Sequence, residues 1–359
     1  VDFGMLHLSA FRMSAFFFIS GVLFSTRRFT DFKSYALHKT KVLLLPYIWL
    51  SLLFLALDPV IYNFSLYAKV PKMVVLNTYP VITNVTEYIG WNFAKIFVAG
   101  KSSIGSGPIW FVFTLYSISL MFYGVQKFAL LLSSRAPTRN LPCAHKIQNP
   151  ALQKIIIAIV TAACFASGWA LFRNHIRLPL GIERDLTCLG FFAMGWLSKD
   201  FINSCHPSRR VNVLKLFIAI ATFALYAYFE SPNPNFSIMN NDLGKTFWGF
   251  FASSIFGIIG LVATFQLSEK LPDVAPIRIV KGVLRNISRN ALIILAVHWW
   301  ILLVIRLTCK TYLDKPALVW IPFFIVIAFT VGAIPLFRSK FYKVIGKEKI
   351  TAKESLSIK

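Results

Sequence analysis

Nine apolar runs, each about as long as a membrane-crossing helix, constrain this chain more than any other feature. A helix needs about 20 mostly apolar residues to cross the roughly 30 Å hydrocarbon core of a bilayer. Hydrophobic residues make up 57% of the chain and charged residues only 14%. This composition excludes a soluble globular protein, which would be about 25% charged. We therefore predict an all-α fold, a polytopic transmembrane helical bundle. The runs are residues 4–25, 42–62, 108–131, 155–172, 178–198, 211–229, 246–267, 290–308 and 317–337.

The basic residues alternate between the two sides of the predicted membrane. The chain has 38 Lys and Arg against 14 Asp and Glu, and the cytoplasmic loops of membrane proteins carry the basic excess. Alternate connections hold 26 basic residues on one side and 11 on the other. This pattern places the C-terminus and a basic tail, residues 338–359, in the cytoplasm, next to membrane lipids. Because topology accounts for the net charge of +24, no nucleic acid is expected as a partner.

The same pattern places the first residue outside the cytoplasm, although no signal sequence precedes the first run. We therefore expect one earlier span to be missing, so that the chain holds about nine of ten spans. The longest connection, 63–107, is partly apolar, and four of its residues recur at helical spacing. This spacing predicts a short helix on, or dipping into, the outer interface. The four residues are Ile89, Phe93, Ile96 and Phe97.

Two ionisable residues stand out inside the predicted spans, where each costs roughly 2.5–3.5 kcal/mol. At 1.5 Å per residue, Arg12 lies about 12 Å from the outer end of the first span, and His298 about 12 Å from the inner end of the eighth. We expect the two side chains to lie at a similar depth and to face one cavity. Each also has a structural interpretation: His298 as a helix-packing hydrogen-bond donor, and Arg12 as the partner of a carbonyl or a carboxylate.

Charged residues near the ends of two spans are further candidates. Lys39 and Lys41 flank the cytoplasmic start of the second span, where cations could hold the phosphates of a nucleotide-like donor or bind anionic lipid headgroups. The cluster from Glu183 to Asp185 could bind a polar acceptor at the outer mouth or form a surface ion pair. The five cysteines show no metal-ligand spacing, so no metal site is expected.

Six segments, in order along the chain, resemble acyltransferase family three, a family of integral membrane proteins, and within it the fucose O-acetylase-like branch. The resemblance covers nearly the whole chain. It implies one membrane acyltransferase domain over residues 1–337, truncated at its N-terminus. The segments are FRMSAFFFISGVLF (11–24), KTKVLLLPY (39–47), GPIWFVFTLY (107–116), LPLGIERDLTCLGFFAMGW (178–196), MNNDLGK (239–245) and SRNALIILAVHWW (288–300).

This resemblance implies an enzyme of the bacterial inner membrane. It would move an acyl group, usually acetyl, from cytoplasmic acyl-CoA to a hydroxyl of a cell-envelope glycan or a lipid-linked sugar. Acyl-CoA would be the donor substrate, and no bound cofactor is expected. His298 would take the proton from the acceptor hydroxyl, and Arg12 would stabilise the oxyanion or hold the phosphate–pantetheine arm of the donor. The implied donor-binding residues are Lys39 and Lys41, and the implied acceptor-binding residues are Trp110, Asp185, Asn240, Asn241 and Asp242.

The chain departs from the family pattern at three places. The first-helix His often proposed as the family's base lies before the segment where this chain starts, so the chain as given could be inactive. In the intact protein that His would be the base and His298 would orient the substrate. The family's two arginines three residues apart are replaced by Lys39 and Val42, and Ser14 replaces the common Pro.

Two other functions remain open from the sequence. A non-catalytic permease or flippase for a lipid-linked sugar would use the same cavity and the same midplane charges. Within the enzyme class, the FRM-x-AFF run also resembles a branch that transfers succinyl groups to periplasmic glucan. Binding of acyl-CoA on the cytoplasmic side distinguishes the enzymes from the flippase, which has no need of a donor.

Overall fold

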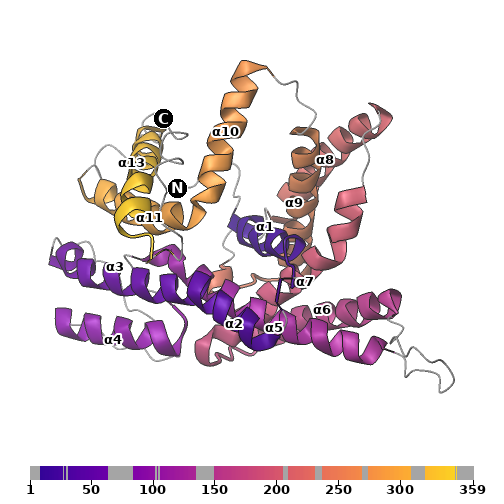
Figure 1. Ribbon diagram of the computed structural model, residues 1–359, viewed down its shortest axis with the longest axis horizontal. Helices are drawn as coiled ribbons and strands as arrows, with labels where there is room; N and C mark the ends of the chain where they lie inside the picture. The colour runs from indigo at the N-terminus through magenta and orange to yellow at the C-terminus, as the bar shows by residue number, and fades with distance from the viewer. Residues whose placement is uncertain are drawn as a thin grey trace. The chain divides into compact units, whose positions relative to one another are not determined.

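The computed structural model confirms the all-α fold (Figure 1). In the part of the chain that it describes, the only β contact is an isolated bridge between Ser237 and Asp242. It describes residues 9–26, 28–29, 31–63, 84–101, 103, 106–134, 149–204, 209–230, 237–268, 274–308, 320–343 and 345. The predicted residues 4–8 of the first run and 346–359 of the tail lie outside these ranges.

Twelve α-helices and four short turns are named within the described residues. The helices are α1 (Ser9–Val22), α2 (Phe32–Lys39), α3 (Leu45–Asn63), α4 (Val85–Val98), α5 (Trp110–Ser133), α6 (Pro150–Arg173), α7 (Ile182–Ser204), α8 (Arg209–Glu230), α9 (Phe247–Ser268), α10 (Ala275–Arg289), α11 (Ala291–Thr308) and α13 (Trp320–Lys340). The turns are η1 (Thr40–Leu44), η2 (Gly107–Ile109), η3 (Pro179–Gly181) and η4 (Ile238–Asn240).

Each of the nine predicted runs coincides with a helix, and the short helix predicted within 63–107 is α4. Its place at the outer interface stays a prediction. Of the described helices, four stretches are long and apolar enough to cross a membrane, or five if α10 and α11, bent by 85°, count as one span. Three of the other predicted runs have a physical reason: the described apolar parts of two, Phe11–Val22 and Val213–Phe229, are too short, and α7 carries Glu183 and Asp185 in its first turn. The four stretches are Phe32–Pro59, Gly107–Ser133, Pro150–Arg173 and Phe247–Ser268.

The chain divides into two compact units whose segments alternate along the sequence. The first unit comprises residues 1–35, 117–178 and 182–272, and the second comprises residues 36–116, 179–181 and 273–359. Because the segments interleave, no single cut in the chain separates the units. The predicted single membrane domain, 1–337, stays a prediction.

The first unit is built around α7, which packs against α1 and α6, while α9 packs against α1 and α8. Its interior is rich in aromatic rings because Phe is the main large apolar residue of these helices. Phe24 meets Phe122 and Phe192 edge to face, with ring centroids 5.0 Å and 5.6 Å apart. Edge-to-face pairs of this kind add about 0.5–1.5 kcal/mol to the effect of burial.

Two glycines let α1 and α7 approach each other backbone to backbone. A Cβ atom at Gly21 would overlap the carbonyl oxygen of Phe192, and one at Gly195 would overlap that of Phe18. These glycines end the FFFISG and FFAMG segments, two of the segments that carry the family resemblance. Small residues are the usual means by which membrane helices pack closely, because lipid tails provide no hydrophobic drive between helices.

In the second unit, α3 packs against α4, and α11 packs against α13. Ile293 of α11, Ile334 of α13 and Ile345 form a small buried cluster between these last elements. The turn η2 contacts both α3 and α11, and it therefore joins the two helix pairs. A Cβ atom at Gly107 would lie 2.7 Å from the indole nitrogen of Trp299, so glycine is needed where this ring covers the turn.

The glycine contact between α1 and α7 makes a testable prediction. Gly195→Ala places a methyl group on a backbone oxygen, which cannot move aside as a side chain can, and overpacking costs about 1–3 kcal/mol. We expect the thermal unfolding midpoint of the purified variant in detergent to be lower than that of the wild-type protein. The matched control is Gly124→Ala on α5, where nothing lies within 4 Å of the added Cβ. This control gains up to about 1 kcal/mol of helix propensity. Equal midpoints for the two variants would contradict the proposed contact.

Candidate functional site

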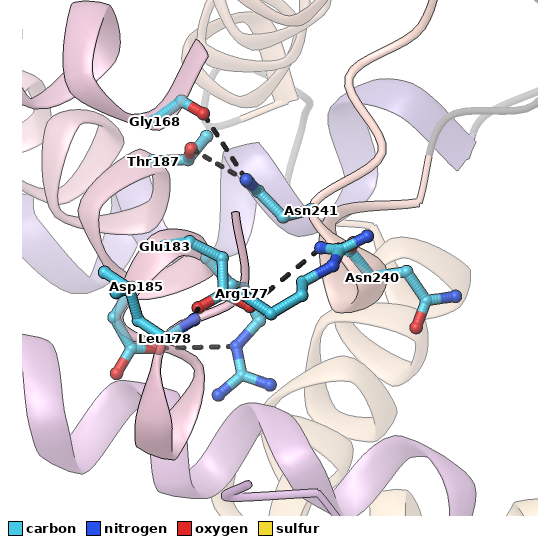
Figure 2. A network of polar contacts seen from close by, with 9 residues as sticks. Gly168, Arg177, Leu178, Glu183, Asp185, Thr187, Asn240 and Asn241 are labelled. Atoms are coloured by element: carbon cyan, nitrogen blue, oxygen red, sulfur yellow. Dashed lines mark hydrogen bonds and ion pairs between the residues drawn. The ribbon is translucent and has the colours of Figure 1, made fainter. Parts of the chain in front are cut away.

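A network of polar side chains gathers where α7 begins in the first unit (Figure 2). Glu183 accepts a hydrogen bond from the backbone amide of Leu178 at 3.0 Å. The Nη1 atom of Arg177 lies 3.9 Å from Oε1 of Glu183, and it also donates to the backbone carbonyl of Asn240. Arg177 therefore ties the segment around η4 to the start of α7.

Two oppositely charged neighbours at the start of α7 are fully buried. The Nε atom of Arg184 lies 3.3 Å from Oδ1 of Asp185, and the two residues are 1% and 0% exposed. Taking two charges out of water costs several kcal/mol each, which their mutual attraction offsets only when the geometry is good. The predicted acceptor residue Asp185 is therefore part of a buried ion pair, and the interpretation of this cluster as a surface ion pair is wrong.

Asn241 and Asp242, two further predicted acceptor residues, shape the segment that meets α7. The amide of Asn241 accepts from the hydroxyl of Thr187 at 3.3 Å and donates to the carbonyl of Gly168 at 3.4 Å. Asn241 is buried and has a positive φ of 46°, a conformation that Asn tolerates better than most residues. Asp242 accepts from the backbone amide of Gly244 at 3.2 Å. Asn240 is exposed, and its side chain points away from the network (Figure 2).

These observations show that the structure brings four predicted residues to one end of α7: Asp185 and the three residues 240–242. All four take part in contacts that hold this part of the fold together, Asn240 through its backbone carbonyl. Their role toward an acceptor is untested and stays a prediction.

A second polar site, in the second unit, lies between α3 and α4. The hydroxyl of Tyr88 donates to Oδ2 of Asp58 at 2.9 Å. Asp58 is 0% exposed, Asn92 is 1% exposed and Lys95 is 7% exposed. Except for the buried Ile96, the large aliphatic and Phe side chains of α4 lie on its other face, where Phe93 is 51% exposed. This inverted pattern, polar inside and apolar outside, is typical of a helix in contact with lipid.

Two tyrosine hydrogen bonds define the register of this helix pair. Besides the bond from Tyr88 to Asp58, the hydroxyl of Tyr47 donates to the carbonyl of Ile96 at 2.8 Å. The helices therefore run antiparallel, and Asn92 lies level with the middle of α3, near Ser51. In the described part of the chain, neither Oδ1 of Asn92 nor the hydroxyl of Ser51 has a hydrogen-bond partner. Two buried polar atoms of this face are therefore not satisfied by the described part of the chain.

Sequence reasoning missed Asp58 and Lys95. Asp58 stands within the second apolar run, where an ionisable residue is as costly as Arg12 in the first. Lys95 stands on the helical stretch that was predicted at the outer interface. The signal was therefore present at Asp58, and counting every charge inside an apolar run would have found it.

Near the predicted cytoplasmic start of the second span, the KTKVLLL segment forms an unusual turn. Residues Thr40–Leu44 form the π-helical turn η1 between α2 and α3. Such turns are rare and often mark functional positions. The hydroxyl of Thr40, between the two predicted donor-binding lysines, lies 3.2 Å from the hydroxyl of Tyr116. Lys39 is half-buried and Lys41 is exposed.

His298 is half-buried on α11, and its Nδ1 atom lies 2.8 Å from the carbonyl oxygen of Ile294. A carbonyl oxygen only accepts hydrogen bonds, so Nδ1 must carry a proton. In the neutral ring the lone pair is then on Nε2, which can take up a proton. Trp110 is buried at the start of α5, directly after η2, the turn that Trp299 covers.

Arg12 lies on α1 of the first unit with an exposed side chain, whereas His298 lies in the second unit. The expectation that the two face one cavity stays a prediction. Among the described residues, no group of three His, Cys, Asp or Glu side chains is placed to hold a metal ion.

Lys95 provides a prediction about pH. Burial, followed by repulsion from Lys101, lowers its pKa from 10.5 to about 8, although attraction to Asp58 opposes the shift. Between these two pKa values the unfolded chain binds more protons than the folded protein, so stability must rise with pH across this window. We expect Lys95→Met to remove this rise from the pH profile of the unfolding midpoint. Lys33→Met, at an exposed position, serves as the control and should keep the wild-type slope.

The comparisons with known proteins agree with these features. The model of acyltransferase family three, described as an acyltransferase domain, matches residues 2–338. Comparison with curated proteins found no match, and neither did comparison with solved structures. The family match spans every segment that carried the resemblance, and the helices it covers include those apolar enough to cross a membrane. The chain therefore belongs to acyltransferase family three, and the protein is a membrane acyltransferase.

Proposed function

We propose that this acyltransferase belongs to the fucose O-acetylase-like branch and transfers an acetyl group from cytoplasmic acyl-CoA to a sugar hydroxyl. The acceptor would be a cell-envelope glycan or a lipid-linked saccharide at the outer face of a bacterial inner membrane. The C-terminus would lie in the cytoplasm, as the alternation of basic connections indicates. The observation that carries the chemistry is the hydrogen bond from Nδ1 of His298 to the carbonyl of Ile294.

This hydrogen bond supports His298 as the general base. With Nδ1 protonated, Nε2 takes the proton of the acceptor hydroxyl as its oxygen attacks the thioester carbonyl. The tetrahedral intermediate then collapses, the C–S bond breaks, and the CoA thiolate leaves. The imidazolium returns its proton to this thiolate, so that the products are the acetyl ester and free CoA, and the histidine is restored.

Arg12 is proposed to stabilise the oxyanion of this intermediate or to hold the phosphate–pantetheine arm of the donor. Its support is the position of a permanently charged guanidinium on α1, a helix otherwise rich in Phe. A preorganised cation at the developing negative charge is usually a large catalytic contribution. As an exposed side chain, Arg12 needs no rearrangement of the helix core to reach a ligand.

Lys39 and Lys41 are proposed to hold the phosphates of acyl-CoA. They flank Thr40 at the π-helical turn η1, a rare kind of turn that often occurs at functional sites. On the acceptor side we propose Trp110, Asp185 and the three residues 240–242. Asp185 and residues 240–242 gather at one end of α7, which supports treating them as one group.

Mass spectrometry of cell-envelope glycans tests the proposed reaction. A deletion strain would carry the wild-type gene, His298→Asn or the control His38→Asn. Asn can replace Nδ1 as the donor to Ile294 but has no equivalent of Nε2. We expect acetyl mass on one sugar with the wild-type and His38→Asn genes. With His298→Asn this mass should fall by about 10²–10⁴-fold, the usual contribution of a general base.

Two other results would redirect the interpretation. Unchanged acylation in the deletion strain, together with accumulated lipid-linked sugar, would indicate a flippase and overturn the proposed enzyme reaction. A succinyl mass in place of the acetyl mass, found on periplasmic glucan, would identify the transferred group as succinyl and the acceptor as that glucan. Full activity of His298→Asn would remove His298 as the base while leaving the transferase in place.

Binding of acetyl-CoA to the purified protein tests the donor site. We expect Lys39→Gln combined with Lys41→Gln to raise the Kd for acetyl-CoA by about tenfold or more, since charge-assisted bonds to phosphate each contribute about 1.5–3 kcal/mol. Lys33→Gln, which removes a charge from the same connection, is the control. If all three lysines affect the Kd equally, the effect is a general one of surface charge, and the proposed donor site is wrong.

A further inference from the structure

Helix α10 carries its basic residues on one face and its large apolar residues on the other. Four basic residues recur every three or four positions and so share one face of the helix. The apolar residues Val280, Leu284 and Ile287 occupy the opposite face. The basic residues are Arg278, Lys281, Arg285 and Arg289.

In the part of the chain that the structure describes, the apolar face of α10 is left exposed. No residue of this helix is buried, although the helix is described throughout. Ile279 is 67% exposed, Val280 56% and Leu284 58%. A soluble surface helix would bury such a face against a core. Here the two faces, one cationic and one apolar, fit the two layers of a membrane surface.

The bend between α10 and α11 gives the orientation. Figure 1 shows the bend between the two helices. They meet at 85°, and the residue between them, Asn290, is buried. Asn290 closes α10 by donating from its backbone amide to the carbonyls of Asn286 and Ile287, and it opens α11 by accepting from Ile293 and Ile294. If α11 crosses the membrane, α10 therefore runs nearly parallel to the membrane plane.

We propose that α10 lies in the cytoplasmic interface of the membrane, with its basic face bound to anionic phospholipid headgroups and its apolar face among the acyl chains. Charge complementarity supports this partner, because each Lys or Arg near an anionic leaflet contributes about 1 kcal/mol of attraction. A helix of 15 residues spans about 22 Å, so all four cations reach the same plane of headgroups.

This attachment also sets the depth of His298. Nδ1 of His298 donates to the carbonyl of Ile294, and the backbone amide of Ile294 donates to the carbonyl of Asn290 at the bend. His298 follows Asn290 by eight residues, which places it about 12 Å further along α11. This consequence rests on the proposed function, whereas the position of α10 does not.

A cysteine scan of residues 277–287 by spin-label EPR tests the position of α10. The full-length protein, with its native cysteines replaced, is reconstituted in phosphatidylcholine vesicles with or without phosphatidylglycerol. We expect collisions with oxygen, which concentrates in lipid, to peak at Val280, Leu284 and Ile287. Collisions with a water-soluble nickel complex should peak on the basic face. Water access at every position, or protection from both reagents, would overturn the proposal.

Charge variants test the lipid partner. Lys281→Gln combined with Arg285→Gln should lower the ratio of lipid-inserted to water-exposed spin label by about tenfold or more in vesicles that contain phosphatidylglycerol. The matched control, Arg28→Gln combined with Lys33→Gln, removes two exposed charges from another connection predicted on the same side. If the control lowers insertion equally, or if phosphatidylglycerol has no effect, the headgroup contact is wrong.

Acetyl transfer in the same vesicles separates this proposal from the proposed function. Loss of α10 insertion together with lower transfer supports the link to His298. Loss of insertion with unchanged transfer overturns that link but leaves the position of α10 intact. If the wild-type protein transfers no acetyl group at all, the proposed function fails, while the EPR profile still decides the position of α10.

Discussion

In hydrocarbon, a backbone amide or carbonyl without a partner costs several kcal/mol, and helices satisfy these groups within their own segment. Every element described at length in this protein follows from that constraint. The same cost applies to side chains, so that ionisable groups among apolar helices occur in contact with one another. Arg184 lies against Asp185, and Tyr88 bonds to Asp58. Each unit therefore has a buried polar contact within an otherwise apolar interior.

Close packing between helices depends on a different feature, the absence of side chains at the contact. Gly21 and Gly195 let α1 and α7 meet at their backbones, each glycine facing a carbonyl of the other helix. Both residues end segments in which Phe repeats. The glycines provide the contact, and the rings around them, such as Phe24 with Phe192, fill the remaining space. The resemblance of these segments to the family therefore reflects packing as well as chemistry.

Most of the helix pattern could be predicted from the sequence, whereas the candidate sites could be predicted only in part. His298 and the residues around Asp185 were recognisable as polar groups in apolar or motif-bearing segments. Their neighbours were not, because Arg177 reaches residue 240 across more than 60 positions of the chain. Asp58 and Lys95 lie 37 positions apart, and only the antiparallel pairing of α3 with α4 brings them into one polar face. Spacing along a chain carries no information on such contacts.

The sequence by itself determined that this protein is an all-α membrane protein. Its apolar runs have the length that the thickness of a bilayer requires, and this length can be read without knowing how the helices pack. It also determined where charges stand along each helix, including the two faces of α10. Only the tertiary structure decided that Asp58 and Lys95, on different helices, share one polar face, and how sharply α10 turns into α11. These properties depend on distances between groups remote in sequence or on the angle at a single residue, and both arise only when helices pack.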